Sequence, residues 1–233
     1  MKKRNFTLLW LALSFLAAFA LWTVLVRLVD VQPIGPEGSR IGFAAMNGAF
    51  HDLTGVHWTL YTITDWMGLL PIAIALGFAV LGLSQLIERK SLCRVDRSIL
   101  ILGGFYVVVL AAYLLFETVV INYRPVLENG EIAASYPSSH TMLTLTIAGS
   151  GIFMLRGRIS CKPALISAET LSVAVMLVMV VGRALSGVHY LTDIFGGMLL
   201  SSAIVSLFAA FLPVNPRNAR TAQPTRIQEN EFH

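Results

Sequence analysis

The sequence has little charge. Aspartate, glutamate, lysine and arginine make up 13% of its 233 residues, whereas about 25% is usual for a soluble domain. Hydrophobic residues make up 56%. This composition excludes an ordinary soluble domain and predicts an integral membrane protein. The net charge of +4 does not indicate a nucleic-acid-binding protein, because the basic residues lie in short loops between apolar runs.

Cysteine is also scarce, since Cys93 and Cys161 are the only two. Both lie in loops that the charge pattern assigns to the cytoplasm, where thiols stay reduced. Neither has a metal-ligating neighbour at a suitable spacing. We therefore expect no disulfide and no metal site from them.

What the sequence does contain is six apolar runs, each near the ~20 residues that cross a bilayer as a helix. They cover residues 6–28, 61–87, 98–121, 141–155, 163–181 and 193–212. The fourth is short and extends back toward Ser138. These runs predict an all-α fold, a six-helix transmembrane bundle that forms one domain over residues 1–214. The polar tail over residues 215–233 shows no apolar periodicity and is predicted to be disordered.

The basic residues predict the orientation in the membrane. Most of the 17 lysines and arginines lie at the N-terminus, after the second and fourth runs, and in the tail. By the positive-inside rule, both termini are cytoplasmic. The remaining loops then face the extracytoplasmic side. The short loops and the short basic N-terminal region are typical of a multi-pass protein of a bacterial plasma membrane.

The segment after the first run predicts an additional helix. Turn-forming residues are followed by apolar residues at positions 41, 43, 46, 50 and 53, which fall near one helical face. This pattern is typical of an extracytoplasmic helix that lies in the membrane interface. Such a helix can anchor the chain or cover a lipid-entry cleft, and the sequence leaves both roles open.

Arg183, His189 and Asp193 lie where the fifth apolar run gives way to the sixth. Ionisable groups near membrane depth are costly, so they indicate a site. A helix is expected to begin near Val188, which places His189 and Asp193 four residues apart on one face. The carboxylate would then accept a hydrogen bond from one ring nitrogen and leave the other as a nucleophile or base.

A second polar segment, residues 136–140, predicts the start of the fourth membrane helix. The free N–H groups and the hydroxyls of Ser138 and Ser139 suit a phosphate group, and His140 would stand beside it as a proton donor. Arg124 and Arg183 carry forked, permanently charged donors that also suit phosphate. The two segments together indicate phosphate chemistry.

The order Arg-Pro, Pro-Ser-x-His and Arg-x5-His-x3-Asp resembles the type 2 phosphatidic acid phosphatase superfamily, and the six-run layout resembles its integral-membrane branch. The resemblance implies that His189 is the nucleophile, that Asp193 orients it, and that His140 protonates the leaving oxygen and later activates water. It further implies a phosphate site without metal or other cofactor, formed by Arg124, Arg183, Ser138 and Ser139.

Three positions depart from the family pattern. Glu117 stands where the family has a lysine, Ser139 where it has a glycine, and Gly182 where it has a serine. Glu117 matters most, because a carboxylate replaces a phosphate-binding cation. Three consequences remain open for it: pairing with an arginine, selection of a substrate with a basic headgroup, or weak catalysis.

The resemblance implies a membrane phosphatase that hydrolyses a lipid phosphomonoester or a polyprenyl diphosphate at the outer face through a phosphohistidine. Candidate substrates are undecaprenyl diphosphate, phosphatidic acid and phosphatidylglycerol phosphate. Two alternatives are a phosphotransferase that uses a lipid acceptor and a silent scaffold, which Glu117 favours. A transporter would place its ionisable groups near the bilayer midplane, whereas these gather at one interface. The expected partners are the lipid substrate and membrane lipids, and the oligomeric state is open.

Overall fold

The computed structural model describes residues 2–128 and 130–213. Within them the chain is helical and has no β-strand beyond isolated bridges. The α-helices are α1 (Lys2–Leu28), α2 (Ala44–Thr54), α3 (Trp58–Met67), α4 (Leu69–Arg89), α5 (Arg97–Thr118), α6 (Ser139–Arg156), α7 (Lys162–Leu185) and α8 (Leu191–Phe211). The predicted all-α class is confirmed. The tail over residues 215–233 lies outside the described residues.

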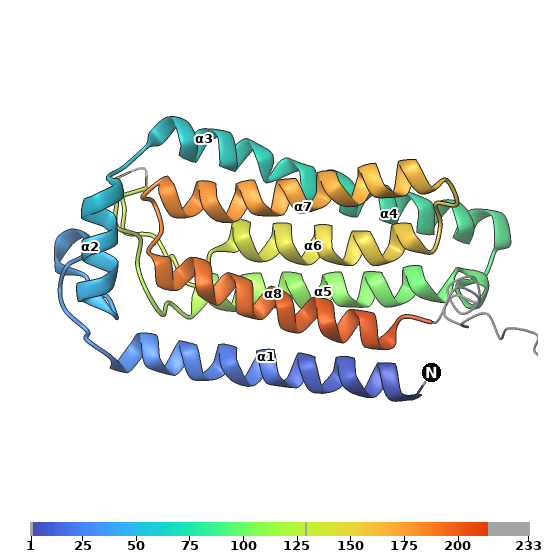
Figure 1. Ribbon diagram of the computed structural model, residues 1–233, viewed down its shortest axis with the longest axis horizontal. Coiled ribbons are helices and arrows are strands. Elements are labelled where there is room, and N and C mark those ends of the chain that lie inside the picture. Colours follow the sequence, from blue (N-terminus) through green and yellow to red (C-terminus); the bar gives the residue numbers. More distant parts are fainter. Residues whose placement is uncertain (1, 129, 214–233) are drawn as a thin grey trace, which may run out of the picture.

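The helices form one elongated bundle (Figure 1). Six segments run side by side along its long axis, namely α1, α3 followed by α4, α5, α6, α7 and α8, while α2 lies across one end. Five of these segments are long and apolar enough to cross a membrane, and α6 is the one that is not. The fourth predicted run is therefore a helix of the bundle, but its composition differs from that of the other five.

The position of α6 explains its polar composition. It packs against α8, α7 and α4, and its buried residues include Thr144, Thr146 and Ser150. A helix enclosed by other helices meets little lipid, so small and polar side chains are tolerated and allow close packing. The outer helices instead expose apolar side chains such as Leu76 and Val107, as expected for a surface that faces lipid.

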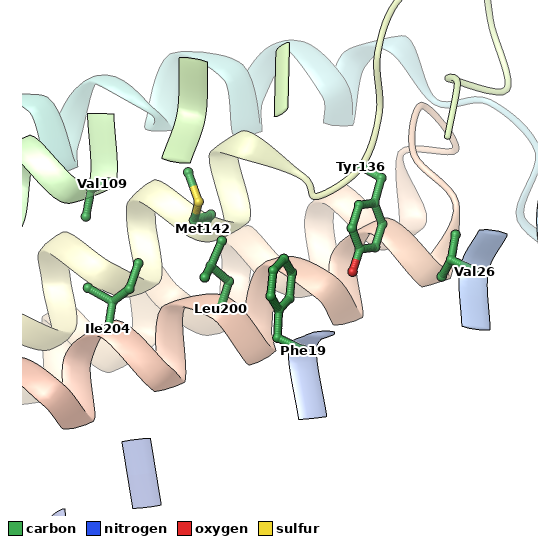
Figure 2. Close-up of a cluster of buried hydrophobic side chains, with 7 residues drawn as sticks. All are labelled: Phe19, Val26, Val109, Tyr136, Met142, Leu200 and Ile204. Carbon is green, nitrogen blue, oxygen red and sulfur yellow. The ribbon is translucent and has the colours of Figure 1, made fainter. Parts of the chain in front are cut away.

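The centre of the bundle is α8. In its most apolar stretch 67% of the residues are buried, against 6–17% in the other four candidate spans. Figure 2 shows the apolar cluster around it, to which α1 contributes Phe19 and Val26 and α8 contributes Leu200 and Ile204. Tyr136, from the loop before α6, completes this cluster next to the polar end of the bundle.

Glycines near the start of α8 allow that loop to reach the helix. A Cβ at Gly196 would lie 2.5 Å from Cε2 of Tyr136, and one at Gly197 would lie 3.1 Å from the carbonyl oxygen of Ser138. The Tyr136 hydroxyl also contacts Oγ1 of Thr23 on α1, at 2.7 Å. These contacts fix the segment that carries the Pro-Ser-Ser-His motif against α8.

The crosswise helix α2 is held to the same end by a buried asparagine. Asn47 donates to the carbonyl oxygen of Gly42 at 2.8 Å and to Oγ1 of Thr192 at 3.0 Å. The predicted helix exists but begins at Ala44, because Phe43 adopts a left-handed φ of 51°. Its location in a membrane interface stays a prediction.

The loop between α7 and α8 depends on one glycine, which gives a first prediction. Gly187 has φ +70°, and a Cβ there would lie 1.9 Å from the carbonyl oxygen of Gly55. Gly38 has a similar φ of +75° with nothing within 4 Å. A left-handed alanine costs about 1 kcal/mol, so Gly38→Ala should lower the thermal midpoint slightly. Gly187→Ala should lower it much further, because the backbone must also shift.

Thermal unfolding in detergent, followed by circular dichroism, measures both midpoints. Equal midpoints for the two variants would contradict the tight contact between residues 187 and 55.

Candidate phosphate site

The two polar segments meet at the end of the bundle that α2 crosses (Figure 1). The parts that meet are the loop between α5 and α6, the first turn of α6, the last turn of α7, and the loop into α8. One hydrogen bond joins the two motifs directly, since the N–H of Ser138 donates to the carbonyl oxygen of Asp193 at 3.0 Å.

The predicted helical pairing of His189 with Asp193 is wrong in its geometry. Helix α8 begins at Leu191 rather than near Val188. It begins there because the carboxylate of Asp193 accepts the N–H of Tyr190 at 3.0 Å and so caps the helix. His189 therefore lies in the loop before the helix, and the two side chains do not share a helical face.

A serine instead joins the two side chains. Oγ of Ser135 donates to Oδ2 of Asp193 at 2.5 Å and lies 2.9 Å from Nδ1 of His189. Because the serine proton points to the carboxylate, the serine oxygen must accept a hydrogen bond from the imidazole N–H. His189 is then the Nδ1–H tautomer, and its Nε2 atom carries a free lone pair.

The free nitrogen of His189 is the most reactive group in this arrangement. Its Nε2 atom is buried and has no hydrogen-bond partner among the described residues. Burial, and then the positive charges of Arg124 and Arg183, hold the pKa of His189 well below its usual value of 6.5. The ring is thus neutral near pH 7, which is the state that a nucleophile requires.

The other oxygen of Asp193 is held by a buried polar network. Oδ1 accepts from Nδ2 of Asn122 at 3.2 Å and from Oγ1 of Thr192 at 3.3 Å. Sequence reasoning missed Ser135 and Asn122. The sequence did offer a signal, because Ser135 lies two residues before Pro137 and Asn122 lies two residues before Arg124. Polar residues this close to a motif are expected to lie near it in the fold.

A second network surrounds Arg183, whose side chain is fully buried. Its Nη2 atom lies 2.6 Å from Nδ1 of His140 and 3.6 Å from Oδ1 of Asp65. Because a guanidinium can only donate, His140 must accept at Nδ1 and carry its proton on Nε2. That Nε2 atom lies 3.2 Å from Oδ1 of Asp65. Each histidine therefore has a carboxylate that orients it, directly for His140 and through Ser135 for His189.

One face of α3 completes the surroundings of Arg183. The guanidinium lies over the ring of Tyr61, 4.9 Å from its centroid, and Nη1 lies 3.5 Å from Oγ1 of Thr64. Tyr61, Thr64 and Asp65 are spaced by three and four residues, so they share a helical face. Sequence reasoning missed this face, although Asp65 is the only charged residue in the run 61–87.

The second arginine lies in the loop between α5 and α6. Arg124 is held by a bridge between Tyr123 and Ala134, and its side chain is 12% exposed. Its Nη1 atom pairs with Oε1 of Glu128 at 3.2 Å. Arg124 is thus fixed beside Ser135, the residue that follows Ala134.

A narrow pocket brings several predicted residues together. Its polar lining includes Arg124, Ser135, Ser139 and His189, and Glu117 lies in its wall. Ser138 does not line it, because its N–H already donates to Asp193 and its hydroxyl accepts from Oγ1 of Thr141. Of the two serines predicted to hold phosphate, the geometry favours Ser139.

Comparisons with known proteins gave a family match and a structural match. Residues 120–217 match the family model described as the PAP2 superfamily. This part of the chain is therefore similar to the PAP2 superfamily. The matched region holds all three motif segments, so the resemblance seen in the sequence is confirmed.

The PAP2 fold extends over nearly the whole chain. One solved structure that it resembles is "the first transmembrane PAP2 type phosphatidylglycerolphosphate phosphatase from Bacillus subtilis", with a TM-score of 0.56 and 14% sequence identity. The match covers 93% of this chain and 100% of that chain. At this identity the likeness concerns the fold, which is that of a multi-pass membrane protein. The comparison with curated proteins gave no match.

The structure explains one departure from the PAP2 pattern. A Cβ at Gly182, where the pattern has a serine, would lie 2.5 Å from Cγ2 of Thr64. The glycine therefore lets α3 approach α7 and place its polar face on Arg183. A similar close approach occurs at Gly68, where a Cβ would lie 2.7 Å from Cδ2 of His140.

The protonation state of His189 gives a second prediction. In protein labelled with 15N-histidine, His189 should be the neutral Nδ1–H tautomer at pH 6, where a histidine of ordinary pKa 6.5 would be mostly protonated. The lowered pKa moves protonation to a more acidic pH. Ser135→Ala removes the acceptor and should weaken the preference for this tautomer.

Nitrogen NMR spectra between pH 5 and 8 test this, with His189→Gln to assign the signal. A protonated His189 ring at pH 6, or an unchanged tautomer in Ser135→Ala, would contradict the bridge.

Proposed function

We propose that this PAP2 protein is a phosphatase that hydrolyses a lipid phosphomonoester or a polyprenyl diphosphate through a phosphohistidine intermediate. The observation that carries the proposal is the free lone pair on Nε2 of His189. It is buried without a partner among the described residues, and its histidine lines the same pocket as Arg124. A neutral histidine beside a fixed guanidinium suits attack on a phosphorus atom that the guanidinium holds.

In the first step Nε2 of His189 attacks the terminal phosphorus. The bond from that phosphorus to the leaving oxygen breaks, which is the lipid alcohol oxygen in a phosphomonoester and the bridging oxygen in a diphosphate. The phosphorylated ring keeps its proton on Nδ1 and becomes positively charged. The Nδ1–H group donates to Ser135, which in turn donates to the Asp193 carboxylate. The negative charge of the carboxylate thereby stabilises the cation. His140 carries a proton on Nε2 and donates it to the leaving oxygen.

In the second step the dephosphorylated lipid leaves and water takes its place. His140, which has lost a proton, accepts one from water as the water oxygen attacks phosphorus. The nitrogen–phosphorus bond breaks, and inorganic phosphate and the original His189 are formed. Arg124 and Arg183 supply the positive charge that both transition states need, because each spreads negative charge over the phosphoryl oxygens.

The apolar outer surface of the bundle supports a lipid as the substrate. The site lies at one end of the helices, where a lipid phosphate in the adjoining leaflet would be found. The excess of basic residues at the opposite end supports an extracytoplasmic location for the site. Phosphatidylglycerol phosphate, phosphatidic acid and undecaprenyl diphosphate all fit this description.

Two other functions would use the same fold. A phosphotransferase would pass the phosphoryl group from His189 to a lipid acceptor, and phosphate would then appear on that lipid. A silent scaffold would release no phosphate from any lipid. The paired networks around His140 and His189 favour an active enzyme, because a scaffold has no use for two oriented histidines.

Release of inorganic phosphate by the purified protein tests the proposal. We expect release from at least one of these lipids, and a loss of at least about 1000-fold in His189→Ala, since that variant lacks the proposed nucleophile. His57→Ala is the matched control, because His57 lies at the same end of the bundle but outside the pocket. It should keep near wild-type activity.

Release that persists in His189→Ala would contradict the nucleophile. Labelled phosphate found on an acceptor lipid instead of in solution would favour the phosphotransferase.

Vanadate gives an independent prediction. It adopts the five-coordinate geometry of the phosphoryl transition state, so the arginines and His189 should bind it more tightly than phosphate. We expect competitive inhibition with an inhibition constant at least about tenfold below that of phosphate. Equal inhibition by the two anions would contradict a site built for that transition state.

A further inference from the structure

Glu117, which stands where the PAP2 pattern has a lysine, lies in the wall of the phosphate pocket. It belongs to the last turn of α5, and the pocket it lines also contains Arg124 and His189. Glu117 is exposed. It forms no hydrogen bond or ion pair with the described residues. Arg124 pairs with Glu128 instead, so an arginine does not neutralise Glu117.

The positive side chains in and beside the pocket are too few to neutralise a bound phosphate. The guanidinium groups are those of Arg124 and Arg183. Against them stand four carboxylates, which belong to Asp65, Glu117, Glu128 and Asp193. The hydrogen bonds described above leave both histidines neutral. A phosphate dianion that enters this pocket adds more negative charge, which favours a substrate that also carries a positive group.

The side chains next to Glu117 suit an organic ammonium group. Tyr113 and Phe116 from the same helix and Tyr136 from the following loop line the pocket beside it. A carboxylate flanked by aromatic rings is a common environment for an alkylammonium group. The described residues contain no cluster of three or more His, Cys, Asp or Glu side chains that could hold a metal ion. This donor set therefore favours an ammonium over a metal cation.

We propose that the substrate is a lipid phosphate with a primary amine close to its phosphate, and that Glu117 binds the ammonium. The proposal rests on the phosphatase function above and narrows its substrate class. Glu117 and His189 line one narrow pocket, so the amine must lie within a few bonds of the phosphate. A phosphorylated sphingoid base has this arrangement, whereas phosphatidic acid has no amine.

A pair of matched lipids tests the proposal. Sphingosine 1-phosphate carries a free ammonium, and N-acetylsphingosine 1-phosphate carries a neutral amide at the same position. Phosphate release from each in mixed micelles gives kcat/KM values for the wild type, Glu117→Gln, and Glu37→Gln. Glu37 is an exposed glutamate outside the pocket and serves as the control.

We expect the wild type to prefer the amine by about tenfold or more in kcat/KM. In Glu117→Gln this preference should disappear, with a higher KM for the amine and a lower KM for the amide, because the carboxylate no longer repels the phosphate. Glu37→Gln should keep the wild-type preference. A shift toward the amide in Glu117→Lys would support the same assignment.

Equal kcat/KM for the two lipids in the wild type, or the same preference in Glu117→Gln, would overturn the proposal while the phosphatase function stands. A requirement for a divalent cation that is abolished by Glu117→Gln would overturn it in favour of a metal ion. Failure of the wild type to release phosphate from either lipid, and from phosphatidic acid and undecaprenyl diphosphate, would contradict the phosphatase function itself.

Discussion

The buried guanidinium of Arg183 is the constraint around which the helices are arranged. A charge enclosed at this depth is costly unless it is paired and hydrogen-bonded, and α7 alone supplies no partner. The partners come from Asp65, Thr64 and Tyr61 on α3 and from His140 on α6. Three helices must therefore meet at one point. Gly182 and Gly68 permit this, because any larger residue would separate α3 from α7 or displace the His140 ring.

The carboxylate of Asp193 has a comparable role for the loops. It caps the N-terminus of α8, accepts from Asn122 in the preceding loop, and reaches His189 through Ser135. Folding of α8 and orientation of His189 thus depend on the same two oxygen atoms. A substitution at this position would disturb both, so loss of activity there does not by itself separate catalysis from structure.

The sequence was informative where chemistry is local. Apolar runs predicted the membrane helices, and the fixed spacing of Arg183, His189 and Asp193 indicated phosphate chemistry before any fold was known. It was misleading where the geometry depends on turns. His189 and Asp193 are four residues apart, but the helix begins between them, so their link passes through a residue more than fifty positions away in the chain. The long-range contacts of Ser135 and Asp65 result from how the helices and loops pack. The spacing of residues within a motif does not predict such contacts. The pattern shows only that Gly182 stands in place of a serine, whereas the fold shows that the missing side chain leaves space for Thr64.

The polar composition of α6 has a consequence for biogenesis. A segment with buried threonines and serines partitions poorly into lipid on its own, because its hydroxyls and its short apolar length make the transfer from the translocon to the bilayer unfavourable. We expect α6 to enter the membrane together with neighbouring helices, because these helices shield its polar face. The helix that carries His140 would then be inserted only when the protein around it is assembled, so that membrane integration and completion of the site are a single event.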